Sequence, residues 1–211
     1  MKILAHRGIC LNGKKENTLN SLFKGLDEGF GVETDIRDFN GQLVISHDIP
    51  TNDSAIPLER LLRYYSDGKF TSILGINIKS NGLHSQLHRE LHDHNIKQYF
   101  VFDMSVPDTL GYLKMGMTTF IRQSDVESHP EMVPLTQGIW LDELIKPWIN
   151  AKVILGQTAT TNSLCIVSPE LHRREHKRQW SQIEKALDLG CPEKKLMICT
   201  DYPHEAKRIF K

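Results

Sequence analysis

Several features that mark common protein classes are missing from this sequence of 211 residues. The four cysteines include no pair at C-x-x-C spacing, which argues against a zinc-ribbon or thioredoxin-type motif. So few cysteines in a chain of this size also argue against a disulfide framework and favour a reducing compartment. We therefore expect a cytoplasmic location.

Long apolar runs and an excess of one charge are also absent. No stretch approaches the roughly 18–20 apolar residues of a transmembrane helix, and the residues before His6 are too few for a signal-peptide apolar region. The 26 lysines and arginines balance 26 aspartates and glutamates, whereas nucleic-acid-binding proteins usually carry a basic excess. We therefore expect neither a transmembrane segment nor a nucleic-acid partner.

Short apolar stretches alternate with amphipathic stretches along the chain. Apolar residues recur with the helical period over residues 17–28, and Gly29 is typical of a helix end. Asn40-Gly41 predicts a tight hairpin turn between a strand over 32–37 and a returning strand over 43–46. Further helices are expected over 58–65, 83–94, 106–115, 180–189 and 203–210.

Eight predicted strands alternate with these stretches, apart from the hairpin partner. They begin near residues 3, 32, 73, 99, 118, 138, 164 and 196. Eight such units predict a small α/β protein of the (β/α)8 barrel type. The alternative is a doubly wound open sheet, but no G-x-G-x-x-G follows the first strand. Without a visible linker or repeat, we expect one domain over residues 1–211.

Polar side chains follow the predicted strands, where the active face of such barrels lies. Glu33 and Asp35 are two apart on one strand and therefore face the same way. Paired carboxylates are hard ligands for Mg²⁺ or Ca²⁺, and an arginine such as Arg7 offers a fork to a phosphate. Two histidines, His6 and His47, can divide general acid and base work.

An ordered set of short motifs carries a family resemblance. Ala5-His6-Arg7-Gly8, Glu16-Asn17-Thr18, Glu33-Thr34-Asp35 and His47-Asp48 resemble the glycerophosphodiester phosphodiesterase family, whose barrels belong to the phospholipase C-like phosphodiesterase type. Thr200-Asp201-Tyr202-Pro203 resembles the last-strand motif of that family. The matches are dense between residues 5 and 48 and thinner, but still in order, up to residue 203.

The resemblance implies a metal-dependent phosphodiesterase and a role for each site residue. The implied roles are an acid/base pair of His6 and His47, phosphate binding by Arg7 and Lys79, metal binding by Glu33 and Asp35, and orientation of neighbouring groups by Glu16. In the family, the hydroxyl next to the phosphodiester attacks phosphorus, and water then opens the cyclic phosphate. One divalent cation, Mg²⁺ or Ca²⁺, is the implied cofactor.

The sequence departs from the family pattern at three places. Asn77 stands where the family usually has a metal-binding glutamate; its amide oxygen can still coordinate the cation, but brings no charge. Only residues 49–56 separate His47-Asp48 from the next helix, so the family's long insertion is missing. Lys15 replaces a proline. We expect a substrate other than a simple glycerophosphodiester, such as a sugar-linked or surface-polysaccharide-related diester.

Two other functions stay open at this stage. The barrel could be a phosphate-binding protein without turnover, which the uncharged Asn77 favours, or a cyclising phospholipase-like lyase that stops at the cyclic phosphate. A basic run over residues 172–178 is interpreted first as a solvated helix start. The second interpretation is recognition of a distal anion, since loops after the seventh and eighth strands of such barrels often hold phosphate.

Overall fold

The computed structural model describes residues 1–10, 17–52 and 54–210, so Lys15 and Glu16 lie outside the described residues. Two compact units are present. The N-terminal unit is Leu4–Thr119, and the C-terminal unit combines Met1–Ile3 with the chain from Phe120 onward. Each unit is an α/β structure. The single domain expected over residues 1–211 stays a prediction.

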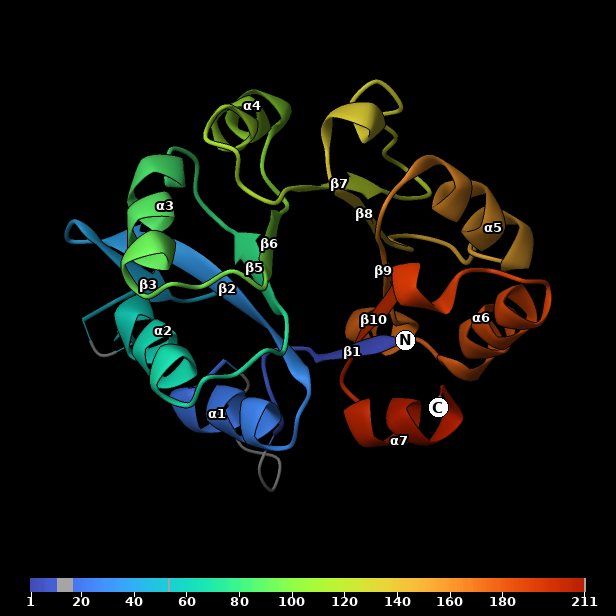
Figure 1. Ribbon diagram of the computed structural model, residues 1–211, viewed down its shortest axis with the longest axis horizontal. Coiled ribbons are helices and arrows are strands. Elements are labelled where there is room, and N and C mark those ends of the chain that lie inside the picture. Colours follow the sequence, from blue (N-terminus) through green and yellow to red (C-terminus); the bar gives the residue numbers. More distant parts are fainter. Residues whose placement is uncertain (11–16, 53, 211) are drawn as a thin grey trace. The chain divides into compact units, whose positions relative to one another are not determined.

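Parallel strands form the centre of the N-terminal unit. Strands β1 (Lys2–Ala5), β2 (Gly31–Phe39), β5 (Leu74–Ile78) and β6 (Tyr99–Phe102) pair in that order. An antiparallel edge, β3 (Gln42–Ile45) and β4 (Ile56–Pro57), continues from the far end of β2. The helices of this unit are α1 (Leu19–Asp27), α2 (Leu58–Asp67), α3 (His84–Asp93) and α4 (Val106–Lys114), which lie to one side of its strands in Figure 1.

Local chemistry explains where these elements begin and turn. Helix α1 begins after a capping box, in which the Thr18 hydroxyl accepts the Ser21 N–H at 3.2 Å and the Ser21 hydroxyl accepts the Thr18 N–H at 3.1 Å. The predicted hairpin turn is confirmed: Asn40 and Gly41 have φ of 49° and 78°. Positive φ at both central residues is the condition for the tight turn that matches strand twist.

The two faces of β2 meet different surroundings. Val32 and Ile36 join the apolar core, which includes Leu22 of α1, Leu62 of α2 and Leu87 of α3. Because side chains alternate along a strand, Glu33 and Asp35 lie on the opposite face from these core residues. The helices therefore cover the apolar face of β2 and leave its two carboxylates on the other face.

Four parallel strands also form the C-terminal unit. They pair in the order β7 (Phe120–Gln123), β8 (Gly138–Leu141), β9 (Leu164–Val167) and β10 (Leu196–Thr200). The helices are α5 (Ala151–Thr160), α6 (Lys177–Asp188) and α7 (Pro203–Ile209), with short 3₁₀ helices η1 (Val133–Leu135), η2 (Pro169–His172) and η3 (Glu193–Lys195). Trp180 of α6 is buried with Ile154, Ile166 and Ile183.

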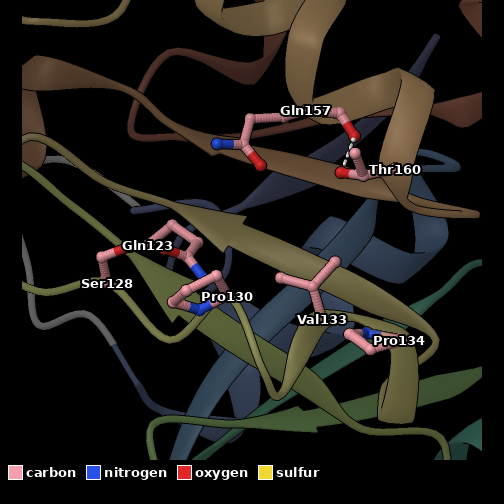
Figure 2. Close-up of a pocket in the computed structure, with 7 residues that line it drawn as sticks. All are labelled: Gln123, Ser128, Pro130, Val133, Pro134, Gln157 and Thr160. Carbon is pink, nitrogen blue, oxygen red and sulfur yellow. Dashed lines mark hydrogen bonds between the residues drawn. The ribbon is translucent and has the colours of Figure 1, made fainter.

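The connection from β7 to β8 differs from the expected strand–helix alternation. Its described residues include only the 3₁₀ helix η1, because Pro130 and Pro134 each remove a backbone donor and disfavour a continuous helix. A hollow of about 370 Å³ lies here. Figure 2 shows Pro130, Val133 and Pro134 on one side of it and Gln157 and Thr160 of α5 on the other.

All eight strands predicted in alternation are found as parallel strands, and the predicted helices are confirmed to within a few residues at each end. Helix α5 was not predicted. Its sequence contains a glycine, a valine and two threonines, which are weak helix formers, and the helix begins at an Asn150 cap that accepts the Val153 N–H at 3.1 Å. Among the described residues, no helix combines the length and apolar character needed to cross a bilayer.

Candidate active site

Two carboxylates are buried side by side on β2 of the N-terminal unit. Glu33 is 1% exposed and Asp35 is 0% exposed, and both lie on the face of β2 that the helices do not cover. In the register with β5, Asp35 lies opposite Asn77. Burying an ionised carboxylate is costly unless positive charge or hydrogen bonds offset it, so the surroundings of each carboxylate decide what the site can do.

Two side-chain cations flank the carboxylate of Asp35. Nε of Arg7 lies 2.9 Å from Oδ2, and Nζ of Lys79 lies 3.3 Å from Oδ1. Lys79 also reaches Oδ2 of Asp103 at 3.5 Å. The backbone holds Lys79 at this place, because its N–H donates to the Ile36 carbonyl at 3.0 Å. In the order Arg7, Asp35, Lys79 and Asp103, these side chains thus form one chain of alternating charge.

Glu33 has weaker partners than Asp35. The Arg7 N–H donates to its Oε2 at 3.3 Å, and Nε2 of His6 lies 3.9 Å from the same oxygen. Burial, and then the neighbouring charge of Asp35, raise the pKa of Glu33 from 4.5 to about 7, against the opposing effects of His6, Arg7 and Lys79. This carboxyl group can therefore hold or release a proton near neutral pH.

A tight turn after β1 places His6 and Arg7 beside these carboxylates. Arg7 has φ of 53° and Gly8 has φ of 82°. A Cβ on Gly8 would stand 2.3 Å from the carbonyl carbon of Ser21, so only glycine permits the close approach of α1. The Ile9 N–H donates to the Ser21 carbonyl at 2.9 Å and fixes that approach.

Asn17 belongs to the site although the sequence motif gave it no role. Its amide Nδ2–H donates to Oδ2 of Asp35 at 3.1 Å, while its Oδ1 accepts the Thr34 hydroxyl at 2.6 Å. Its backbone has φ of 61° and its N–H donates to the Arg7 carbonyl at 2.9 Å. Glu16, to which the sequence assigned an orienting role, lies outside the described residues.

His47 follows β3 and is more open to solvent than the other site residues. Its side chain is 49% exposed, and its Nδ1 lies 2.9 Å from Oδ1 of Asp48. The hydrogen bond and charge of His47 lower the pKa of Asp48 below its usual value, and Arg37 and Arg7 add to this effect. Arg7 and His47 both line one hollow of about 610 Å³, and Asn17, Ser46 and Asp48 line it as well.

The predicted site residues are therefore only partly joined by direct contacts. His6, Arg7, Glu33, Asp35 and Lys79 form a connected cluster. His47 and Arg7 line the same hollow. In the described part of the chain, no ion pair or hydrogen bond joins His47 to Glu33 or Asp35. Asp103 and Asn17 are added to the cluster by their contacts with Lys79 and Asp35.

The oxygen atoms of this cluster suit a hard divalent cation. Oδ1 of Asn77 and Oδ1 of Asp35 are buried and accept no hydrogen bond from any described residue, and Asn77 as a whole is 8% exposed. Carboxylate and amide oxygens are the usual ligands of Mg²⁺ and Ca²⁺. Over residues 1–10, 17–52 and 54–210, no three His, Cys, Asp or Glu side chains gather for a metal ion.

Comparison with known proteins places this chain among phosphodiesterase folds. No family model matches the sequence. The curated proteins contain no match either. A structure from Galdieria sulphuraria, described as a glycerophosphodiester phosphodiesterase, is similar with a TM-score of 0.78 and 15% identity, covering 99% of this chain and 97% of that chain.

Two further solved structures are similar. An Oleispira antarctica phosphodiesterase, in complex with the product sn-glycerol-3-phosphate, has a TM-score of 0.73 and 16% identity, covering 99% of this chain and 96% of that one. A Ca²⁺-dependent phosphatidylinositol-specific phospholipase C from Streptomyces antibioticus has a TM-score of 0.57 and 9% identity, covering 100% and 96%. The chain is similar in fold to these proteins, with the eight predicted parallel strands divided between its two α/β units.

Proposed function

We propose that this protein is a phosphoric diester hydrolase, similar to glycerophosphodiester phosphodiesterases, that works with one divalent cation. The observation that carries the proposal is the buried carboxylate pair of Glu33 and Asp35 beside the cations of Arg7 and Lys79. It occurs in a fold shared with several glycerophosphodiester phosphodiesterases. The proposal includes a cytoplasmic location and a small-molecule phosphodiester as substrate.

Glu33, Asp35 and Asn77 would hold the cation. Three carboxylates, those of Glu33, Asp35 and Asp103, face the two permanent cations of the cluster. A phosphodiester anion would add to the negative excess, whereas one divalent cation would offset it. Mg²⁺ and Ca²⁺ both suit the oxygen donors, and the similar phospholipase C from Streptomyces is Ca²⁺-dependent. When bound, the cation would supply Lewis acidity toward the phosphoryl oxygens.

Arg7 and Lys79 would bind the phosphate. Arg7 contacts Asp35 through Nε, and the planar fork of a guanidinium suits two phosphate oxygens at once. The side chain also lines the hollow at His47, where a substrate could enter. Lys79 would add a point charge beside the same phosphate. Positive charge held at this place stabilises the charge that develops on the phosphoryl group.

His6 and His47 would transfer protons. One histidine would take the proton of the hydroxyl next to the phosphodiester as that oxygen attacks phosphorus, and the other would protonate the departing alcohol. The roles would then reverse as water opens the cyclic phosphate. Asp48 contacts Nδ1 of His47, which leaves Nε2 as the proton-transfer atom. Glu16 would orient these groups, a role that rests on its place in the Glu16-Asn17-Thr18 motif alone.

The substrate would differ from a simple glycerophosphodiester. Only a short segment separates His47 from α2, and it leaves His47 half exposed at a hollow of about 610 Å³. Such an opening suits a larger alcohol than glycerol, for example a sugar-linked or surface-polysaccharide-related group. The product bound in the similar Oleispira antarctica structure is sn-glycerol-3-phosphate, and a larger alcohol is proposed for this chain.

A phosphate-binding protein without turnover is the second candidate. Asp35 already lies beside two side-chain cations, and Asn77 brings no charge to the proposed metal site. Both observations favour a weak cation site or none. A cyclising lyase is a third candidate, because it would use the same histidines and stop after the first step.

The three candidates differ in their products in ¹⁸O-water. We would incubate the full chain with a panel of glycerol-, sugar- and inositol-linked phosphodiesters and follow ³¹P NMR with Mg²⁺, Ca²⁺ or EDTA. A hydrolase gives a phosphate monoester that carries ¹⁸O, a lyase gives a cyclic phosphate without it, and a binding protein gives no product. His6→Ala and His47→Ala should abolish turnover, whereas His92→Ala on the exposed side of α3 should not.

A further inference from the structure

The loops after β8 and β9 bring together a histidine and an aspartate that the proposed function does not use. β8 and β9 are neighbouring parallel strands, with Leu141 in register with Ile166. Asp142 follows β8 directly, and His172 ends η2 after β9. Nε2 of His172 lies 2.7 Å from Oδ1 of Asp142, whose side chain is 7% exposed, whereas that of His172 is 30% exposed. A buried carboxylate thus orients a partly exposed imidazole.

The acidic groups of these loops are already engaged. Asp142 also accepts the Glu143 N–H at 2.7 Å, and its carbonyl accepts Nε1–H of Trp148 at 2.7 Å. Oε1 of Glu143 accepts the N–H groups of Trp148 and Ile149 and lies 3.3 Å from Nη2 of Arg178. These contacts hold the loop after β8 in one arrangement, and neither carboxylate pairs with Arg173 or Arg174.

Three consecutive residues, His172, Arg173 and Arg174, carry side-chain nitrogen atoms that have no hydrogen-bond partner in the described ranges. Nδ1 of His172 and the guanidinium of Arg173 make no hydrogen bond or ion pair with a described residue. Nε of Arg174 is buried and has no acceptor, while Nη2 donates to the Glu143 carbonyl. Buried donors without acceptors cost free energy that a ligand can recover.

We propose that His172, Arg173 and Arg174 form a binding site for a phosphate-type oxyanion, with Asp142 as a positioning residue. Arginine and charged imidazole N–H groups form the stronger, charge-assisted hydrogen bonds to such anions. Arg173 has φ of 59°, which turns the chain at the end of η2. β9 is the seventh parallel strand in the chain, and loops after the seventh and eighth strands of barrels often bind phosphate.

This site does not depend on the proposed hydrolase activity, since no residue of the Glu33–Asp35 cluster contributes to it. The test is a titration of the full chain with inorganic phosphate at constant pH and ionic strength. The readout is the imidazole ¹H–¹³C NMR signal of His172, assigned by its loss in His172→Gln. We expect a saturable shift, weakened about tenfold in Arg173→Ala. Lys185→Ala, an exposed cation on α6, should leave the titration unchanged.

The same titration in an Arg7→Ala background separates this site from the proposed hydrolase site. A shift of the His172 signal that persists there supports an independent site. A shift that disappears there, a change that never saturates, or equal curves for Arg173→Ala and Lys185→Ala would each overturn the proposal. Failure of the hydrolase assay with a retained His172 titration would sink the proposed function alone.

Discussion

Asn77 and Asp35 lie opposite each other in the register between β5 and β2, and Oδ1 of each is buried without a hydrogen bond from a described residue. Oδ1 of Asp35 has the Lys79 ammonium 3.3 Å away, whereas Asn77 is a neutral acceptor. Under the proposal both oxygens are cation ligands. The uncharged amide of Asn77 then limits the affinity of the site for a cation.

Asn77→Glu should tighten binding of Mg²⁺ or Ca²⁺ by about tenfold or more, because it adds a charged oxygen donor opposite Asp35. Isothermal titration calorimetry measures the change. Gln98→Glu, which adds the same charge at an exposed position, is the matched control and should leave the affinity unchanged. Equal affinities for Asn77→Glu and wild type would mean that residue 77 does not contact the cation.

The raised pKa of Glu33 predicts a specific dependence of stability on pH. The folded protein binds the proton of the Glu33 carboxyl group more tightly than the unfolded chain does. The stabilisation that this proton gives is therefore complete below pH 4.5 and is lost as pH rises through about 7. The loss should amount to about 3 kcal/mol in unfolding free energy. Urea unfolding in EDTA, from pH 4 to 8, should show this fall in wild type but not in Glu33→Gln.

Two additions sharpen that experiment. Glu184→Gln, on the exposed side of α6, should keep the wild-type pH dependence. A divalent cation should reverse the fall above pH 7 by favouring the charged carboxylate. Curves for Glu33→Gln and wild type that run parallel across the range would contradict the raised pKa.

The paired residues of β2 were predictable because strand alternation is a local rule. Glu33 and Asp35 stand two apart, and the period of two places them on one face wherever the strand runs. The strand starts were predictable for a similar reason, since short apolar runs separate sharply from amphipathic helices. The resemblance of His6-Arg7-Gly8 to a known motif predicted that these residues lie near the carboxylates. In the structure, the turn after β1 brings His6 and Arg7 next to Glu33.

Other parts depend on contacts that no local pattern encodes. Asn17 reaches Asp35 because its own φ is positive and its N–H is held by Arg7. Asp103 meets Lys79 only because β6 pairs with β5. Helix α5 contains several weak helix formers and packs against α6. Each of these features requires the tertiary arrangement before it can be recognised.

Asn17 offers a test of side-chain positioning without backbone change. Asn17→Gly keeps the left-handed backbone accessible but removes the amide between Thr34 and Asp35. We expect turnover to fall about tenfold, consistent with the loss of a charge-assisted hydrogen bond, while thermal stability changes little. Asn17→Ala should lose the same activity and a further ~1 kcal/mol of stability, since alanine disfavours positive φ. Full activity in Asn17→Gly would remove Asn17 from the site.

Gly8 and Gly29 form a matched pair for backbone strain. Both have φ near 80°, but a Cβ on Gly8 would stand 2.3 Å from Ser21, whereas a Cβ on Gly29 would meet nothing within 4 Å. Gly8→Ala should therefore cost roughly 3 kcal/mol or more in unfolding free energy, and Gly29→Ala about 1 kcal/mol. Chemical denaturation measures both. Similar losses for the two variants would argue against close packing of the turn after β1 onto α1.

The most direct test of the account is the rate of phosphodiester hydrolysis as a function of Mg²⁺ or Ca²⁺ concentration, measured for wild type and Glu33→Gln. The account predicts that EDTA reduces the wild-type rate to background, that one of the two cations restores it saturably, and that Glu33→Gln requires about tenfold more cation or stays inactive. Hydrolysis that is unaffected by EDTA, or a cation dependence that Glu33→Gln leaves unchanged, would contradict the assignment of this cluster as a cation-dependent phosphodiesterase site.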